Sequence, residues 1–242
     1  MTGPRMPDVL PEGTAKREAV RHMFDAIAPR YDLVNRVMTF GLDTRWRRRT
    51  IATLGLSPAS VVVDLAAGTG DLCRGLVAAG HIAVGVDLSF GMLAAARTSS
   101  PLVQADALAL PMPDGAVDGA TCGFALRNLV DLAACFAELA RVVRPGGRIG
   151  LLEVAEPTSP LLRRGHAVYF GKVVPSLGGL LSDGPFRAGA GGAAYRYLPR
   201  SVAYLPPPGE LVAMLRRTGF ADASRTPLSG GISQLLVATR DH

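Results

Sequence analysis

Residues 61–70, which read VVVDLAAGTG and continue into Asp71 and Leu72, decide the fold of this chain. The three consecutive valines are typical of a strand that is buried on both faces of a parallel sheet. Gly68 and Gly70 then allow a sharp turn and a close approach of the backbone to a ligand, which a side chain would block. The stretch therefore predicts a strand, a glycine turn and a helix start, an arrangement that binds nucleotides.

A second predicted strand ends in Asp87, which lies 23 residues after Asp64. An acidic residue at this spacing is placed to accept hydrogen bonds from the two hydroxyls of a ribose. The third glycine of a dinucleotide motif is replaced by Cys73, and Asp71 at the helix start would repel a pyrophosphate. These features favour S-adenosylmethionine, which is cationic and has no phosphate, over NAD. A tight turn that binds nothing is the alternative interpretation.

Strand and helix signals alternate after the glycine turn. We expect parallel strands at residues 61–65, 82–87, 102–105, 117–123 and 148–153, with helices at 71–79, 90–97 and 132–143. The Pro-Gly-Gly at 145–147 is expected to end the last of these helices and turn the chain into the fifth strand. A final helix at 209–218 and two strands at 221–226 and 232–238 would add an antiparallel edge hairpin. The pattern predicts an α/β fold with a doubly wound, mostly parallel, seven-stranded sheet and ligands at the carboxyl ends of its strands.

The remaining segments complete a single predicted domain, 15–242, preceded by a disordered tail at 1–14. Helical signals cover residues 14–28, 33–40 and 43–54. We divide the domain into a helical cap (15–56), a cofactor-binding core (57–156), a substrate lid insertion (157–208) and a C-terminal helix with the edge hairpin (209–242).

The composition argues against nucleic acid as a partner. The net charge is +6, but only Lys16 and Lys172 among the 26 basic residues are lysine, which indicates a general arginine bias. Basic residues gather around an aromatic only at residues 45–49, which include Trp46. Nucleic-acid binding is therefore a minor hypothesis, because it usually needs a longer basic surface.

The cysteine, histidine and hydropathy patterns indicate the cellular compartment of the protein and whether it holds a metal. The three cysteines (Cys73, Cys122 and Cys135) lack CxxC spacing, so we expect buried, reduced thiols. The four histidines show no ligand spacing, and no metal is expected. The N-terminus lacks the apolar core of a signal peptide, and no apolar run has the length of a membrane span. These observations predict a cytoplasmic protein.

Two further groups follow predicted strands. Asp106 and Ala107 lie where an adenine would rest against the sheet edge, so the Asp106 carboxylate either accepts from its amino group or caps a turn. Gly123 begins the segment GFALRN at the end of the fourth strand. Arg127, beside Asn128, then either contacts the substrate or forms a salt bridge.

Four separated segments carry a resemblance to class I S-adenosylmethionine-dependent methyltransferases, and within them to the family that C-methylates menaquinone and ubiquinone precursors. They are residues 24–35 (FDAIAPRYDLVN) with Trp46; 64–71; 124–128 with 141–147 and Glu153; and 195–199 (YRYLP) with Ser201 and Val202. The chain departs from the family pattern at Asp43, Gly123, Ala125 and Ala155.

The resemblance implies a Rossmann-like fold and transfer of a methyl group to the ring carbon of demethylmenaquinol, the last step of menaquinone biosynthesis. It implies S-adenosylmethionine contacts from Asp64, Ala66, Gly68, Thr69, Gly70, Asp87, Leu88, Asp106, Ala107 and Gly123. For the acceptor and its proton it implies Arg127, Tyr31, Asp32, Asn128 and Tyr195, with the Arg127 cation stabilising a phenolate. Two alternatives stay open: a related methyltransferase of another phenolic or natural-product acceptor, and a non-catalytic cofactor-binding scaffold of a quinone-synthesis complex.

The expected partner is an isoprenoid quinol. Residues 161–174 combine an apolar face with Arg163, Arg164, His166 and Lys172, which suits either an interfacial segment on anionic lipids or a packed lid. Peripheral contact with the inner face of the plasma membrane therefore stays open, as does a homodimer.

Overall fold

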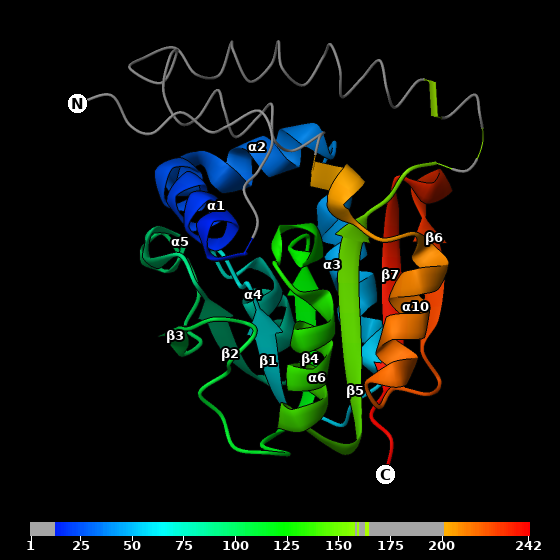
Figure 1. Ribbon diagram of the computed structural model, residues 1–242. Coiled ribbons are helices and arrows are strands. Elements are labelled where there is room, and N and C mark those ends of the chain that lie inside the picture. Colours follow the sequence, from blue (N-terminus) through cyan, green and yellow to red (C-terminus); the bar gives the residue numbers. More distant parts are fainter. Residues whose placement is uncertain (1–12, 158, 160–162, 165–200) are drawn as a thin grey trace, which may run out of the picture.

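The computed structural model describes residues 13–157, 159, 163–164 and 201–242. Seven strands form one sheet in the order β3-β2-β1-β4-β5-β7-β6 (Figure 1). Strands β1 to β5 run parallel, and β7 pairs antiparallel with both β5 and β6. The predicted doubly wound, mostly parallel sheet with an antiparallel hairpin at one edge is confirmed. The strands are β1 (Val61–Leu65), β2 (Ile82–Asp87), β3 (Leu102–Gln104), β4 (Val117–Gly123), β5 (Val143–Val154), β6 (Ser224–Leu228) and β7 (Ser233–Thr239).

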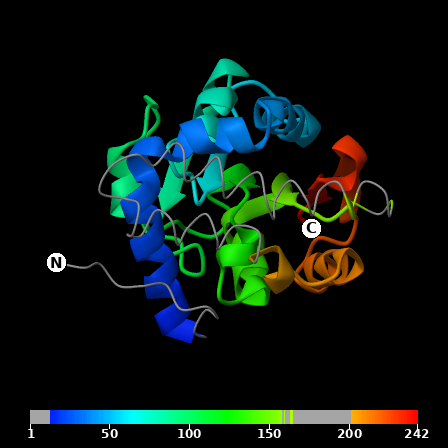
Figure 2. The ribbon, with the colours of Figure 1, turned by 90° about the horizontal axis from the view of Figure 1, so that it is seen from above.

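Val62 and Val63 of β1 are buried on opposite faces of the sheet, as the β-branched run predicts, while Val61 is partly buried. Val62 packs with α3 (Leu42–Leu54) and α4 (Asp71–Ala78) on one face. Val63 belongs to the core on the opposite face, which includes residues of α6 (Leu132–Val142) and α10 (Pro208–Arg217). Helices therefore cover both sides of the sheet, as the view along the strands shows (Figure 2).

Two N-terminal helices, α1 (Gly13–Ile27) and α2 (Tyr31–Met38), lie across the carboxyl ends of the strands (Figure 1). The Asp25 carboxylate of α1 accepts hydrogen bonds from the Ser89 hydroxyl at 2.5 Å and the Gly91 amide at 2.9 Å, at the start of α5 (Phe90–Ala94). A Cβ on Gly91 would lie 2.9 Å from the Cα of Asp25, so glycine allows this close approach. Asp25 thus fixes α1 over the end of β2.

The predicted role of residues 145–147 is wrong in part. Helix α6 already ends at Val142, and the Pro-Gly-Gly segment lies inside β5. The β4–β5 register passes from Val117 opposite Val143 to Gly119 opposite Arg148, so the segment forms an irregularity within the pairing rather than a turn before it. Helix α5 is also shorter than predicted, because the Arg97 amide donates to the Thr69 carbonyl at 3.1 Å instead of continuing the helix.

All three cysteines are buried and unpaired, as expected. No helix in the part of the chain that the structure describes is long and apolar enough to cross a membrane. Most of the predicted lid, including Tyr195 and the basic positions His166 and Lys172, lies outside the described residues.

Candidate active site

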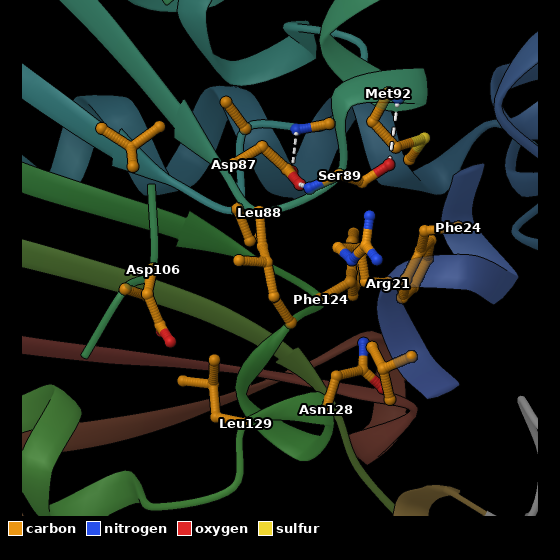
Figure 3. Close-up of a pocket in the computed structure, with 18 of the residues that line it drawn as sticks. Arg21, Phe24, Asp87, Leu88, Ser89, Met92, Asp106, Phe124, Asn128 and Leu129 are labelled. Atoms are coloured by element: carbon orange, nitrogen blue, oxygen red, sulfur yellow. Dashed lines mark hydrogen bonds between the residues drawn. The ribbon is translucent and has the colours of Figure 1, made fainter. Parts of the chain in front are cut away.

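A pocket opens at the carboxyl ends of β1, β2 and β4, beneath α1 (Figure 3). The space at this position, its open mouth included, is about 920 Å³. Its walls come from the segments that follow the strands, 66–68, 86–89, 105–108, 123–125 and 128–130, and from Arg17, Val20, Arg21, Phe24, Tyr31, Arg47 and Met92. The site therefore lies where a doubly wound sheet is expected to bind its ligand.

Asp87 lines this pocket with both carboxylate oxygens fixed. Its Oδ2 accepts from the Gly68 amide and its Oδ1 from the Ser89 amide, each at 2.8 Å. Burial raises the pKa of the Asp87 carboxyl, and the two amides oppose that rise. Each oxygen keeps a lone pair for a further donor, so the side chain is arranged to accept from a pair of neighbouring hydroxyls.

The glycine turn is held in a conformation that side chains rarely adopt. Ala66 (φ 49°), Gly68 (φ 56°) and Gly70 (φ 82°) all have positive φ. Ala66 and Gly68 line the pocket, whereas Thr69 and Gly70 lie behind the wall. A Cβ on Gly70 would come within 2.8 Å of the Thr98 Cγ2, so a larger residue there would have to displace the Thr98 side chain.

Thr69 and Asp32, which the resemblance assigns to cofactor and acceptor, contact each other. The Thr69 hydroxyl donates to the Asp32 carboxylate and ties the glycine turn to α2. Neither residue is among those that line the pocket of the described residues. Their direct contacts with cofactor and acceptor stay predictions.

Asp64 also lies beneath the pocket rather than in its wall. The side chain is 1% exposed and accepts from the Thr121 hydroxyl at 2.8 Å and the Cys73 thiol at 3.6 Å. Burial raises the pKa of the Asp64 carboxyl to about 7. Asp64 thus joins β1 to β4 and α4, and its direct contact with the cofactor stays a prediction.

The charge of Asp71 does not face the pocket. Its carboxylate is paired with Arg74 and lies 3.6 Å from the Arg47 Nη2. The sequence argument that Asp71 repels a pyrophosphate is therefore weakened, because two guanidinium groups compensate its charge.

Asp106 caps a turn, which is one of the two roles that its sequence position allowed, while the adenine contact stays a prediction. Its Oδ1 accepts from the Leu108 amide at 3.0 Å and caps the local turn. Its Oδ2 pairs with the Arg17 Nη1 at 3.0 Å, and the residue lines the pocket beside Ala107. Leu88 and Gly123, the other predicted cofactor contacts, also line the pocket.

Arg127 does not line the pocket of the described residues and forms a salt bridge, which was the alternative to a substrate contact in the sequence analysis. The side chain is 5% exposed and pairs with Glu153, which is 0% exposed. It also donates to the Phe124 carbonyl at 2.7 Å and the Ser201 hydroxyl at 2.9 Å. The short helix η2 (Leu126–Asn128) turns the side chain back under the sheet end, while Asn128 stays in the pocket wall.

The pocket cations are ones that the sequence analysis did not select. Arg21 of α1 and Arg47 of α3 both line it. Arg47 lies in the basic run 45–49, which was considered only as a nucleic-acid footprint. Its neighbour Trp46 is 4% exposed and packs on Phe124 with ring centroids 6.2 Å apart. Consecutive helix positions point about 100° apart, so the buried position of Trp46 did not single out Arg47 within the basic run.

Tyr31 lines the pocket, and its role toward the acceptor stays a prediction. Burial raises the pKa of its phenol, while a hydrogen bond with Asn35 and the positive charge of Arg47 act in the opposite direction. The phenol therefore stays protonated at neutral pH and is a hydrogen-bond donor rather than a base.

A model of the ubiE/COQ5 methyltransferase family matches residues 12–240. The chain belongs to this family.

Relatives in the ubiE/COQ5 family match over most of their length. The ubiquinone/menaquinone biosynthesis C-methyltransferase UbiE of Syntrophotalea carbinolica is 41% identical over 91% of this chain and 93% of that protein. The demethylmenaquinone methyltransferase of Thermus thermophilus is 45% identical over 82% of this chain and 91% of that protein. The residues that line the pocket thus belong to a chain whose relatives are methyltransferases.

Solved structures support the fold of this ubiE/COQ5 family member. Phosphoethanolamine N-methyltransferase 2 of Haemonchus contortus, solved with phosphomonomethylethanolamine and S-adenosylhomocysteine, has a TM-score of 0.63 and 13% identity, covering 92% of this chain and 60% of that one. At this identity the likeness shows a shared methyltransferase fold and carries nothing about the acceptor.

Proposed function

We propose that this chain transfers the methyl group of S-adenosylmethionine to the ring carbon of demethylmenaquinol, giving menaquinol. The observation that carries the proposal is the pocket at the ends of β1, β2 and β4, with Asp87 and Asp106 in its wall, in a member of the ubiE/COQ5 family. The relatives support the choice of acceptor, because they include demethylmenaquinone methyltransferases.

The pocket fits the methyl donor. Asp87 accepts from the two ribose hydroxyls, and Asp106 with Ala107 borders the adenine. Glycine at position 68 leaves space for a ligand beside the backbone. A Cβ there would enter this space and lie 3.3 Å from the Met92 Cε. The bound donor supplies an electrophilic methyl group on a sulfonium.

The acceptor side of the pocket orients a hydroquinone ring. A ring carbon becomes nucleophilic when a neighbouring hydroxyl loses its proton. Tyr31 and Asn128 line this part of the wall and offer a phenol and an amide to the ring oxygens. Phe24 and Phe124 add apolar surface that excludes water from the ring. Arg127 has a positioning role. Its guanidinium donates to the Phe124 carbonyl and so holds the segment that bears Asn128.

The test measures binding and turnover together. The purified protein is incubated with isotopically labelled S-adenosylmethionine and a short-tailed demethylmenaquinol under reducing conditions, and the product is analysed by mass spectrometry. We expect label on the ring carbon, and no product from an Asp87→Ala variant. Cofactor binding without any ring methylation would reject the proposal and favour the scaffold.

The acceptor is checked in cells. Deleting the gene is expected to replace methylated menaquinone by its demethylated form in a quinone profile. An unchanged profile would reject the menaquinone assignment and indicate another phenolic acceptor.

A further inference from the structure

We infer that Arg47 binds the α-carboxylate of the methionine moiety of the methyl donor. The inference rests on the proposed function, since it assigns a residue to one end of the proposed cofactor. It names a binding role for a residue of α3, in a basic run that the resemblance did not assign to any ligand.

The position of Arg47 follows from the order of the strands. Along the carboxyl edge, β3, β2, β1 and β4 are neighbours in that order. The ends of these strands and the segments after them bring four residues to the pocket in the same spatial order: Asp106, Asp87, Gly68 and Gly123. With adenine at Asp106 and ribose at Asp87, the methionine chain continues toward Gly68 and Gly123.

Arg47 lies at that far end. A Cβ on Gly123 would lie 3.2 Å from the Arg47 Nη1, and the guanidinium carbon is 5.3 Å from the centre of the Phe124 ring. Glycine at position 123 therefore leaves room for the guanidinium beside the end of β4. The same group lies 3.6 Å from Asp71, at the start of the helix that follows the glycine turn.

The guanidinium keeps unused hydrogen-bond donors. Arg47 donates no hydrogen bond to any described residue, and its Nε is a buried nitrogen without such a partner. Its ion pairs with Asp43 and Asp71 span 3.8 Å and 3.6 Å, which is longer than a hydrogen bond. Because the side chain is only 13% exposed, water satisfies these donors poorly.

A carboxylate suits these donors better than other anions of the reaction. The planar guanidinium presents paired N–H groups that match the two oxygens of a carboxylate. The donor has one carboxylate, at the end of the chain that points away from the adenine. The ring oxygen of the acceptor is a single atom and offers no such pair.

The other arginines of the wall already have partners. Arg21 donates from Nε and Nη2 to the same oxygen of Glu18, at 3.1 Å and 2.7 Å. Arg17 pairs with Asp106 at the adenine end of the pocket. Arg47 is therefore the pocket cation that combines free donors with the right end of the site.

Calorimetry with two ligands tests the assignment. S-adenosylhomocysteine carries the carboxylate, and its decarboxylated analogue lacks only that group. We expect Arg47→Gln to weaken binding of S-adenosylhomocysteine by about 10- to 100-fold, because a charged hydrogen-bonded pair is lost, and to change binding of the analogue by less than about twofold. Arg47→Lys should recover part of the loss, since it restores charge without the fork.

Arg48→Gln is the matched control: it removes one arginine from the same helix at an exposed position and should leave both affinities unchanged. Equal weakening of both ligands by Arg47→Gln, or no weakening of either, would overturn the assignment while leaving the proposed function intact. A wild-type protein that binds neither ligand would instead overturn the proposed function itself.

Discussion

The guanidinium of Arg127 donates to the carboxylate of Glu153 in an ion pair that is 5% and 0% exposed. The pair joins the segment after β4 to β5, and the same guanidinium holds the Phe124 carbonyl at 2.7 Å. A group that the sequence suggested for substrate contact thus supports the pocket wall from behind.

Removing one partner of this pair should be costly. Arg127→Met leaves the Glu153 carboxylate buried without its cation, and we expect a loss of about 3–5 kcal/mol in the free energy of unfolding, measured by urea denaturation. The exposed pair of Arg144 and Asp118 provides the comparison, where Arg144→Gln should cost about 0–1 kcal/mol. Similar losses in the two variants would contradict a structural role for the buried pair.

Gly70 should tolerate substitution less well than a glycine of similar backbone conformation. Gly80→Ala meets open space at φ 86°, so it should cost only the positive-φ penalty of about 1–2 kcal/mol. Gly70→Ala adds a contact of 2.8 Å with the Thr98 Cγ2, and we expect about 1–3 kcal/mol more. Urea denaturation of both variants isolates the steric term, and equal losses would show that the turn relaxes freely.

Asp64 should make the stability of the fold depend on pH. Burial raises its pKa from 3.8 to about 7, so between these values the native state holds a proton that the unfolded chain releases. The stabilisation is complete below the unfolded pKa and is lost as the pH rises through about 7.

Asp64→Asn removes this titration and keeps an acceptor for the Thr121 hydroxyl. The wild-type free energy of unfolding should fall between pH 5 and pH 8 relative to the variant, by on the order of a few kcal/mol. Burial also raises the pKa of Asp87, but that contribution is present in both proteins and cancels. If the free energies of unfolding of the wild type and the variant change in parallel with pH, Asp64 does not titrate in this range.

Asp87→Asn should weaken cofactor binding. An amide cannot accept on both sides, so its NH2 group opposes either the Gly68 or the Ser89 amide, and the charge toward the ribose is lost. We expect about 10- to 100-fold weaker binding of S-adenosylhomocysteine by calorimetry. Asp118 provides the control, because its carboxylate also accepts from a backbone amide, that of Val61 at 2.7 Å, but at the opposite end of β1. The Asp118→Asn variant should keep wild-type affinity for S-adenosylhomocysteine. Equal affinity of the Asp87 variant and wild type would reject the ribose contact.

The fold was largely readable from short patterns. The bounds of β1, β2 and β4 were predicted as observed, and β1 and β2 show the mostly apolar runs that are typical of buried parallel strands. The Pro-Gly-Gly segment was misread, since its glycines do form an irregular backbone but inside a strand pairing that only β4 reveals. A local pattern cannot show which backbone groups of a distant strand it will meet.

The sequence predicted which strand ends form the pocket, but not which arginine side chains face it. Asp87, Asp106 and Gly123 follow strands, and strand ends of a parallel sheet converge on one edge, so their place in the pocket follows from sequence position. Arg127 pairs with a buried carboxylate, and Arg47, for which no site role was predicted, lines the pocket. Which arginine is buried against a carboxylate and which faces the cavity depends on Glu153, Phe124 and Gly123, residues far from Arg47 in sequence.

The sequence by itself determined the parallel sheet, the glycine turn after β1 and the family, because β-branched runs, positive-φ glycines and separated motifs are local properties of the chain. Only the tertiary structure decided that Asp64 supports the turn from beneath, that Arg127 is neutralised by Glu153, and that Arg47 reaches the end of the pocket with unused donors. The physical reason is that the burial and pairing of a charge depend on neighbours brought together by packing, which residue type and spacing do not encode.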